Sequence, residues 1–217
     1  MKENNKDAQQ IMESDDFKRC ADFHGHVCGG LAIGYQAATA GMDWMKEKRV
    51  LDEELVAIVE TGACCVDAIQ ALTGCTFGKG ILIYKDYGKM GFTFFNRRTG
   101  QGVRLIMRPD TFRVNERQIE LFKKSRDGSI TDAEREELTA LNAQRTGEML
   151  NTKTEALFSI APVTAGMPDK ARIESSKSCA RCGEATMASK LVPVDGQMVC
   201  RGCLASTRET GKPKNKE

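Results

Sequence analysis

The sequence predicts an α/β or α+β core domain followed by a small module rich in cysteine. Short apolar runs typical of strands alternate with segments of helical periodicity over about the first 165 residues. Two CxxC pairs then stand close together near the C-terminus. The composition, 41% hydrophobic and 29% charged, is that of a globular protein. We therefore expect a core domain over residues 1–165, a linker over residues 166–175 and a separate module over residues 176–217.

The N-terminal part of the core domain is predicted to be helical. Ser14 can cap a short helix that continues to about Cys20. Over residues 27–46 the apolar side chains recur at helical spacing. Gly29 and Gly30 would then lie near the start of this second helix, where unpaired N–H groups favour an anionic ligand or a thiolate.

A sheet is predicted in the middle of the chain. Residues 55–59 form a short β-branched run of the buried-strand type, and residues 64–72 follow as a helix. Three further strand candidates are residues 81–84, 91–95 and 103–107. The last two flank residues 99–102, a Thr-Gly-Gln-Gly turn whose glycines can adopt positive φ, so we expect a β-hairpin there.

Two helices are predicted after the hairpin, over residues 115–124 and from Thr131 to about Leu150. Thr131 and Glu134 have the spacing of a capping box, which indicates the start of the longer helix. Its apolar positions are sparse, and they are Leu138, Leu141 and Met149. We therefore expect this helix to lie on the surface or to form a dimer contact.

The core domain is predicted to end soon after residue 160. Residues 156–160 are a last strand candidate. Pro162, Gly166 and Pro168 follow, and they indicate a linker because proline and glycine interrupt regular structure.

The C-terminal module carries a metal-site pattern. Its four cysteines have the spacing CxxC–x17–CxxC, and they are Cys179, Cys182, Cys200 and Cys203. Each CxxC places two thiolates on one tight turn, and two such turns complete a tetrahedral zinc site. Gly183 suits a knuckle turn, residues 191–199 suit a hairpin with an Asp-Gly turn, and Cys203 leads into a helix. This order is that of a treble-clef finger, in which zinc without an open ligand position is structural.

Composition and charge argue against several classes of protein. The formal net charge of +2 disfavours a broad basic face for nucleic acid, and no apolar stretch approaches the roughly 20 residues of a membrane span. The polar residues 1–7 lack the apolar centre of a signal peptide. Nine cysteines without an export signal indicate a reducing compartment. We expect a cytoplasmic protein with no membrane or nucleic-acid partner.

The two histidines of the chain, His24 and His26, lie in one short run beside Cys28. Imidazole and thiolate side chains bind soft metals, or perform acid–base and nucleophilic chemistry near neutral pH. Further along the chain, Cys64 and Asp67 have the i, i+3 spacing of one helix face. The alternative is that the cysteines pack as small hydrophobic residues and hydrogen bonds satisfy the histidines.

A glycine-rich segment follows the helix over residues 64–72. It resembles a phosphate-binding loop but lacks the spacing, because three residues instead of four separate Gly74 from Gly78. Gly80 also replaces the hydroxyl residue that holds magnesium. We therefore interpret the segment as a tight turn whose Lys79 is available to an anionic substrate.

Three segments together resemble one known family. The FmdE family, which takes its name from formylmethanofuran dehydrogenase, has motifs similar to residues 23–35 (FHGHVCGGLAIGY), 64–80 (CCVDAIQALTGCTFGKG) and 86–89 (DYGK). The resemblance covers residues 14–165, and the finger is an extension that some members carry. It implies a thioredoxin-like α+β core with a mixed sheet flanked by helices, a treble-clef finger, and a metal-capable pocket where the first two motifs meet. Members often carry another residue at the position of Gly29, which we do not expect to affect ligation.

The resemblance implies a metal-binding enzyme or accessory factor of anaerobic one-carbon or molybdoenzyme metabolism. The candidate ligands of a core metal are His24, Cys28, Cys64 and Cys75. The candidate catalytic residues are His24, His26, Cys64 and Asp67. Zinc suits thiolate and imidazole ligands, and with an open fourth position it activates water. We expect a molybdenum or tungsten dehydrogenase as a partner and a homodimer as the assembly.

Three alternatives remain for the function. Cys64 could be a redox nucleophile beside an imidazole, without a permanent metal. An iron–sulfur cluster is a second alternative, although the scattered cysteines of the core lack the usual clustered pattern. The protein could also be a non-catalytic adaptor whose finger docks onto a dehydrogenase complex.

Overall fold

The computed structural model describes residues 7–47, 49, 53–109, 111, 114–170 and 173–209. The chain divides into two compact units between Lys170 and Ala171. None of the helices in the described part of the chain is both long and apolar enough to span a membrane.

Three helices open the first unit, and they are α1 (Ala8–Glu13), α2 (Asp15–His24) and α3 (Gly29–Met45). Ser14 caps α2, as predicted, because its side chain accepts a hydrogen bond from the N–H of Phe17. Gly25 ends α2 at a φ of 89°, a left-handed conformation that favours glycine. The Cys28 thiol then caps α3 by accepting from the N–H of Leu31. The histidine run therefore connects the end of α2 to the start of α3.

The first unit contains a five-stranded mixed sheet. Its strands are β1 (Leu55–Val59), β2 (Leu82–Tyr84), β3 (Gly91–Asn96), β4 (Gly102–Met107) and β5 (Phe158–Val163), in the order β2-β1-β3-β4-β5. Only β1 and β2 are parallel, and the remaining neighbours are antiparallel. An order of β2-β1-β3-β4 with β3 antiparallel to the other three strands is that of a thioredoxin-like core, so the predicted α+β fold is confirmed.

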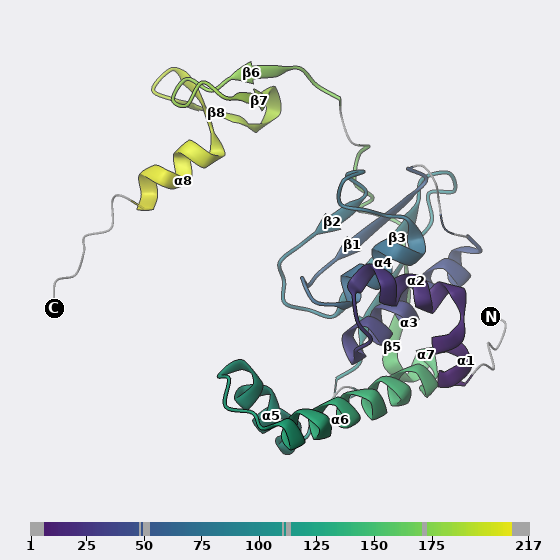
Figure 1. Ribbon diagram of the computed structural model, residues 1–217. Coiled ribbons are helices and arrows are strands. Elements are labelled where there is room, and N and C mark those ends of the chain that lie inside the picture. The colour runs from purple at the N-terminus through teal and green to yellow at the C-terminus, as the bar shows by residue number, and fades with distance from the viewer. Residues whose placement is uncertain are drawn as a thin grey trace. The chain divides into compact units, whose positions relative to one another are not determined.

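Helix α4 (Cys65–Thr73) follows β1 and connects it to the parallel strand β2. In this arrangement the carboxyl ends of β1 and β2 lie at the same edge of the sheet, where the start of α4 is also placed. Helix α3 packs against α4 and against strands β3 and β4 (Figure 1).

Two glycines of α3 allow this close packing. A Cβ atom on Gly34 would lie 2.1 Å from the carbonyl oxygen of Cys65, and one on Gly41 would lie 2.4 Å from the ring of Phe94. Helix α3 therefore lies directly on the first turn of α4 and on the sheet. Because a backbone atom meets the Gly34 position, a larger residue there must displace one of the two helices.

We expect Gly34→Ala to lower the free energy of unfolding by about 3 kcal/mol, at the upper end of what overpacking costs. Gly147 is a matched control, since it is also helical but no atom lies within 4 Å of its added Cβ. Gly147→Ala should instead raise the stability by about 0.5–1 kcal/mol through helix propensity. Urea denaturation of both variants measures the two changes, and equal effects would contradict the packing described here.

A helical hairpin follows the sheet strands, formed by α5 (Glu116–Arg126) and α6 (Asp132–Asn151). The predicted capping box is confirmed, with Thr131 and Glu134 each bonded to the other's backbone N–H. Ion pairs join the two helices, including one of 2.7 Å between Arg117 and Glu137. Figure 1 shows α5 packed beside the first half of α6, whose second half runs toward α1. Most of the side chains of α6 are exposed, as expected of a surface helix.

The end of the core domain differs from the prediction. The short helix α7 (Thr154–Leu157) occupies the start of the expected strand, and β5 runs on to Val163. Pro162 therefore lies in a strand, opposite Val103, and not in the linker. Proline is accepted there because β5 is an edge strand, whose outward side needs no N–H donor.

The second unit consists of two hairpins and a helix. The first hairpin is β6 (Ser176–Ser178) with β7 (Ala185–Met187), and the second is β8 (Leu191–Val194) with β9 (Gln197–Cys200); a 3-10 turn, η1 (Ala188–Lys190), separates them. Asp195 and Gly196 both have positive φ, which confirms the predicted Asp-Gly turn. Helix α8 (Arg201–Glu209) begins two residues before Cys203, and not after it as predicted. The buried apolar residues here are few, namely Cys179, Leu191 and Val199.

Candidate metal centres

Three helix ends bring the residues of the core site together. His24 is the last residue of α2, Cys28 caps the start of α3, and Cys64 stands at the N-cap of α4 with Asp67 in the first turn. The positive ends of two helix dipoles, those of α3 and α4, thus meet near two thiols. Such ends stabilise thiolate and other anions, and here they lie at the carboxyl edge of the parallel strands.

His24 lies between a carboxylate and a thiol. Its Nδ1 is 2.7 Å from Oδ2 of Asp67, and its Nε2 is 3.8 Å from Sγ of Cys28. A tetrahedral ion bound by nitrogen at about 2.0 Å and sulfur at about 2.3 Å would hold these two atoms about 3.6 Å apart. The ring of His26 is 4.4 Å from the ring of His24, and ligand atoms of His24, His26 and Cys28 lie within 4.8 Å of one another. This arrangement fits a metal ion after a small contraction.

Cys64 joins this group through Gly30. A Cβ atom on Gly30 would lie 3.0 Å from Cβ of Cys64, 3.7 Å from its Sγ and 3.8 Å from Sγ of Cys28. The two thiols are hydrogen-bonded to each other. Burial, and then the neighbouring Cys28, raise the pKa of the Cys64 thiol above its ordinary value. The two thiolates therefore need a cation beside them in order to coexist near neutral pH.

The structure separates the remaining cysteines of the core from this group. Cys65 is fully buried, and burial raises its pKa to about 12, so that only Cys64 of the vicinal pair faces the site. Cys75 is also fully buried, with its backbone N–H donating to Oγ1 of Thr73 and its thiol accepting from the amide of Ala57. Burial raises the pKa of Cys75 to about 11. Among the described contacts, none brings Cys75 to His24 or Cys28.

Gln70 is a residue of the site that the motifs do not single out. Its Nε2 atom donates to Oδ1 of Asp67 at 3.4 Å, and its Oε1 accepts from the N–H of Phe77 at 3.1 Å. The only signal in the sequence is the i, i+3 spacing of Asp67 and Gln70 on α4, a spacing too common to indicate a functional residue.

The cysteines of the second unit form a compact tetrad. Sγ of Cys179 is 4.0 Å from Sγ of Cys203, Sγ of Cys182 is 3.9 Å from Sγ of Cys200, and all four sulfurs lie within 4.8 Å of one another. An ion with four sulfurs at about 2.3 Å in tetrahedral geometry places the sulfurs about 3.8 Å apart. The four cysteines therefore fit a single metal ion.

Backbone amides prepare this tetrad for an ion. Hydrogen bonds from the amides of Cys182 and Cys200 lower the pKa of Cys179 to about 6. The thiols of Cys200 and Cys182 act in the opposite direction on Cys203, whose pKa they raise to about 12. Four thiolates this close repel one another, so full ionisation of the tetrad requires a bound cation.

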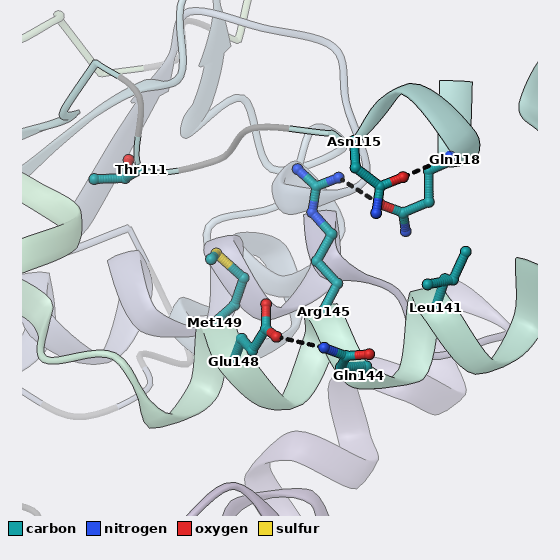
Figure 2. A pocket seen from close by; sticks show the side chains of 8 residues that line it. All are labelled: Thr111, Asn115, Gln118, Leu141, Gln144, Arg145, Glu148 and Met149. Carbon is teal, nitrogen blue, oxygen red and sulfur yellow. Dashed lines mark hydrogen bonds between the residues drawn. The ribbon is translucent and has the colours of Figure 1, made fainter. Parts of the chain in front are cut away.

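A hollow of about 210 Å³ lies between the helices of the α5–α6 hairpin (Figure 2). It is lined by Thr111, Asn115, Gln118, Leu141, Gln144, Arg145, Glu148 and Met149. Several of the polar groups bond to one another, as Gln144 does to Glu148 and Arg145 to Gln118. The lining contains no cysteine or histidine, so the soft-metal chemistry of the chain lies elsewhere.

Comparison with known proteins agrees with the motifs. A family model described as "FmdE, Molybdenum formylmethanofuran dehydrogenase operon" matches residues 23–159. This chain belongs to the FmdE family. The matched region contains every residue of the core site, and the cysteine tetrad lies outside it.

Two relatives of this FmdE protein show how far the likeness extends. The crystal structure of an FmdE-like protein of tungsten formylmethanofuran dehydrogenase, from Syntrophus aciditrophicus, aligns over 92% of this chain and 93% of that one, with a TM-score of 0.58 and 21% identity. That likeness shows the fold. A curated protein from Archaeoglobus fulgidus, named "Probable S-adenosyl-L-methionine-binding protein", is 32% identical over 197 residues. The match covers 87% of this chain and 52% of that relative, so the chain spans about half of its length.

Proposed function

We propose that this FmdE protein is a metal-dependent enzyme or accessory factor of anaerobic one-carbon or molybdoenzyme metabolism, with a metal centre held by His24, Cys28 and Cys64. The observation that carries the proposal is the placement of His24 between Asp67 and Cys28. A metal-binding histidine characteristically donates its other ring N–H to a carboxylate, which fixes the tautomer. With Nδ1 donating to Asp67 at 2.7 Å, the lone pair of Nε2 is directed toward Cys28.

Two thiolates and one imidazole favour zinc, and three protein ligands leave a fourth position for water or a substrate. When bound, zinc would supply Lewis-acid polarisation or activated water at that position. Asp67 orients His24, and the exposed His26 is close enough to act as a fourth ligand or as a general base. The proposed catalytic set is therefore His24, His26, Cys64 and Asp67.

Metal analysis of the anaerobically purified full chain tests this function. We expect two zinc equivalents for each chain, one in the core and one in the finger. His24→Ala should lower the content to one equivalent, and Cys182→Ser should also lower it to one by emptying the other site. If His24→Ala and Cys182→Ser remove the same single equivalent, the core centre does not exist and the proposal is wrong.

We propose that the cysteine tetrad is a treble-clef finger with structural zinc. The S···S distances of 3.9 and 4.0 Å support this, as does the order of two hairpins followed by α8. With so small an apolar cluster, the unit needs the ion to fold. Thiolates that are kept free for metal also suit a reducing compartment, and we place the protein in the cytoplasm.

Thiol-redox chemistry is the second candidate, favoured by the contact between Cys28 and Cys64. The raised pKa of Cys64 opposes it, because a redox nucleophile works as the thiolate and its pKa is normally lowered. Reversible, oxidant-dependent loss of the free Cys64 thiol in a chain that carries no core metal would support this role.

The family link to formylmethanofuran dehydrogenase operons supports a molybdenum or tungsten dehydrogenase as a partner. The finger, as an adaptor module, would be the part that docks it. We also propose a homodimer, for which the exposed Ile119 and Phe122 side chains of α5 offer an apolar contact. Glu116 lies at one end of α5 and Lys123 and Arg126 at the other, so an antiparallel second copy would pair opposite charges.

A further inference from the structure

The loop between α4 and β2 is tied to the core site through one side chain. The N–H of Phe77 donates to Oε1 of Gln70 at 3.1 Å, and Nε2 of Gln70 donates to Oδ1 of Asp67 at 3.4 Å. The other carboxylate oxygen of Asp67 is the one that meets Nδ1 of His24 at 2.7 Å. A continuous chain of hydrogen bonds therefore runs from the loop backbone to the imidazole.

The direction of this chain is determined by the chemistry of its ends. A backbone N–H can only donate, so the atom of Gln70 that faces Phe77 must be the carbonyl oxygen. The amide NH₂ of Gln70 must then face Asp67, which removes the usual ambiguity between the two ends of a glutamine side chain. An ionised Asp67 accepts on both oxygens, from Gln70 and from Nδ1–H of His24.

The loop holds the Phe77 amide in place by bonds of its own. The N–H of Cys75 donates to Oγ1 of Thr73 at 3.0 Å, and Cys75 is completely buried at the base of the loop. Nζ of Lys79 donates to the carbonyl of Gly74 at 3.2 Å, across the loop. The ring of Phe77, in contrast, is 74% exposed. The backbone of the loop therefore contributes to the site while the ring at its tip faces solvent.

We propose that Gln70 is a positioning residue, which couples the loop over residues 74–80 to His24 by holding Asp67 in the orientation that presents Nε2 of His24 to a metal. This inference rests on the proposed metal centre at His24, Cys28 and Cys64. Without the Gln70 amide, the Asp67 side chain can rotate about its terminal bonds, because its 36% exposed side chain is not held by packing alone. His24 then loses its fixed tautomer and ring orientation.

The test is a Co²⁺ titration of the full chain against a competing chelator, with one equivalent of zinc already in the finger. Gln70→Ala should weaken Co²⁺ binding at the core by about 10- to 100-fold, the usual effect of losing a partner behind a metal ligand. Gln70→Glu keeps an acceptor for Phe77 but cannot donate to Asp67, so it should weaken binding at least as much. Phe77→Ala retains the backbone N–H and should leave the affinity within about twofold of the wild type.

Two further measurements separate positioning from loss of structure. The urea midpoint of the metal-free chain should be nearly the same for wild type and Gln70→Ala, and the Co²⁺ absorption spectrum of the variant should change at saturation. Wild-type affinity in Gln70→Glu would overturn the role of Gln70 while leaving the metal centre standing. If the wild-type chain takes up no Co²⁺ beyond the finger site, the metal centre itself is wrong and this inference falls with it.

Discussion

Cys64→Ser is expected to abolish metal binding in the core, whereas Cys65→Ala at the adjacent position should retain it. The two thiols differ in direction, because Cys64 contacts Cys28 at the site and Cys65 is fully buried beneath α3. A serine hydroxyl is a poor substitute for a thiolate ligand, so the affinity should fall by more than about 100-fold. Zinc competition with a chelator measures both variants.

Cys75→Ala provides a second control for the same experiment. Its thiol accepts from Ala57 and lies within the apolar core, so its removal should cost stability without changing the metal content. Loss of core metal in Cys75→Ala or Cys65→Ala, with Cys64→Ser still loaded, would mean that the ligand set is assigned wrongly.

Removal of the ion from the tetrad is expected to unfold the second unit and leave the first intact. The apolar cluster around Leu191 and Val199 is small, and structural zinc supplies on the order of 10 kcal/mol to comparable modules. Chelation followed by limited proteolysis should therefore cleave the chain after residue 170 and preserve the core. A metal-free second unit that resists protease as well as the loaded one would contradict the structural role.

Acid should act on the tetrad in the same direction as the chelator, since protons compete with the metal for thiolates. Metal affinity should fall as the pH is lowered. The fall should steepen below about pH 6, where Cys179 of the metal-free tetrad also binds a proton, so that each ion bound displaces one more proton. Zinc titrations between pH 5 and 8 at about 0.1 M salt would show this change of slope.

Local signals explain why much of this fold could be predicted from the sequence. The Thr131–Glu134 capping box, the Asp195–Gly196 turn and the Thr-Gly-Gln-Gly hairpin each lie within a few residues, and each determines its own structure. The four cysteines of the finger are equally local, because their spacing alone brings two tight turns together. The prediction for Pro162 was wrong because its acceptance in β5 depends on that strand being at the edge of the sheet.

The core site is different because it depends on contacts between helices that are far apart in sequence. Gly30 and Gly34 let α3 approach α4 closely enough for Cys28 and Cys64 to meet, and nothing in their spacing indicates that approach. The same packing places Asp67 beside His24, 43 residues earlier in the chain. It also leaves Cys75 at the base of a loop, although its place in the motif suggested a ligand.

Anomalous X-ray diffraction at the zinc edge, on anaerobically grown crystals of the full chain, tests the central claim most directly. We predict two peaks, one within the tetrad and one about 2.0 Å from Nε2 of His24 and about 2.3 Å from the sulfurs of Cys28 and Cys64. A single peak, in the tetrad alone, from crystals supplied with excess zinc would contradict the proposed core metal centre.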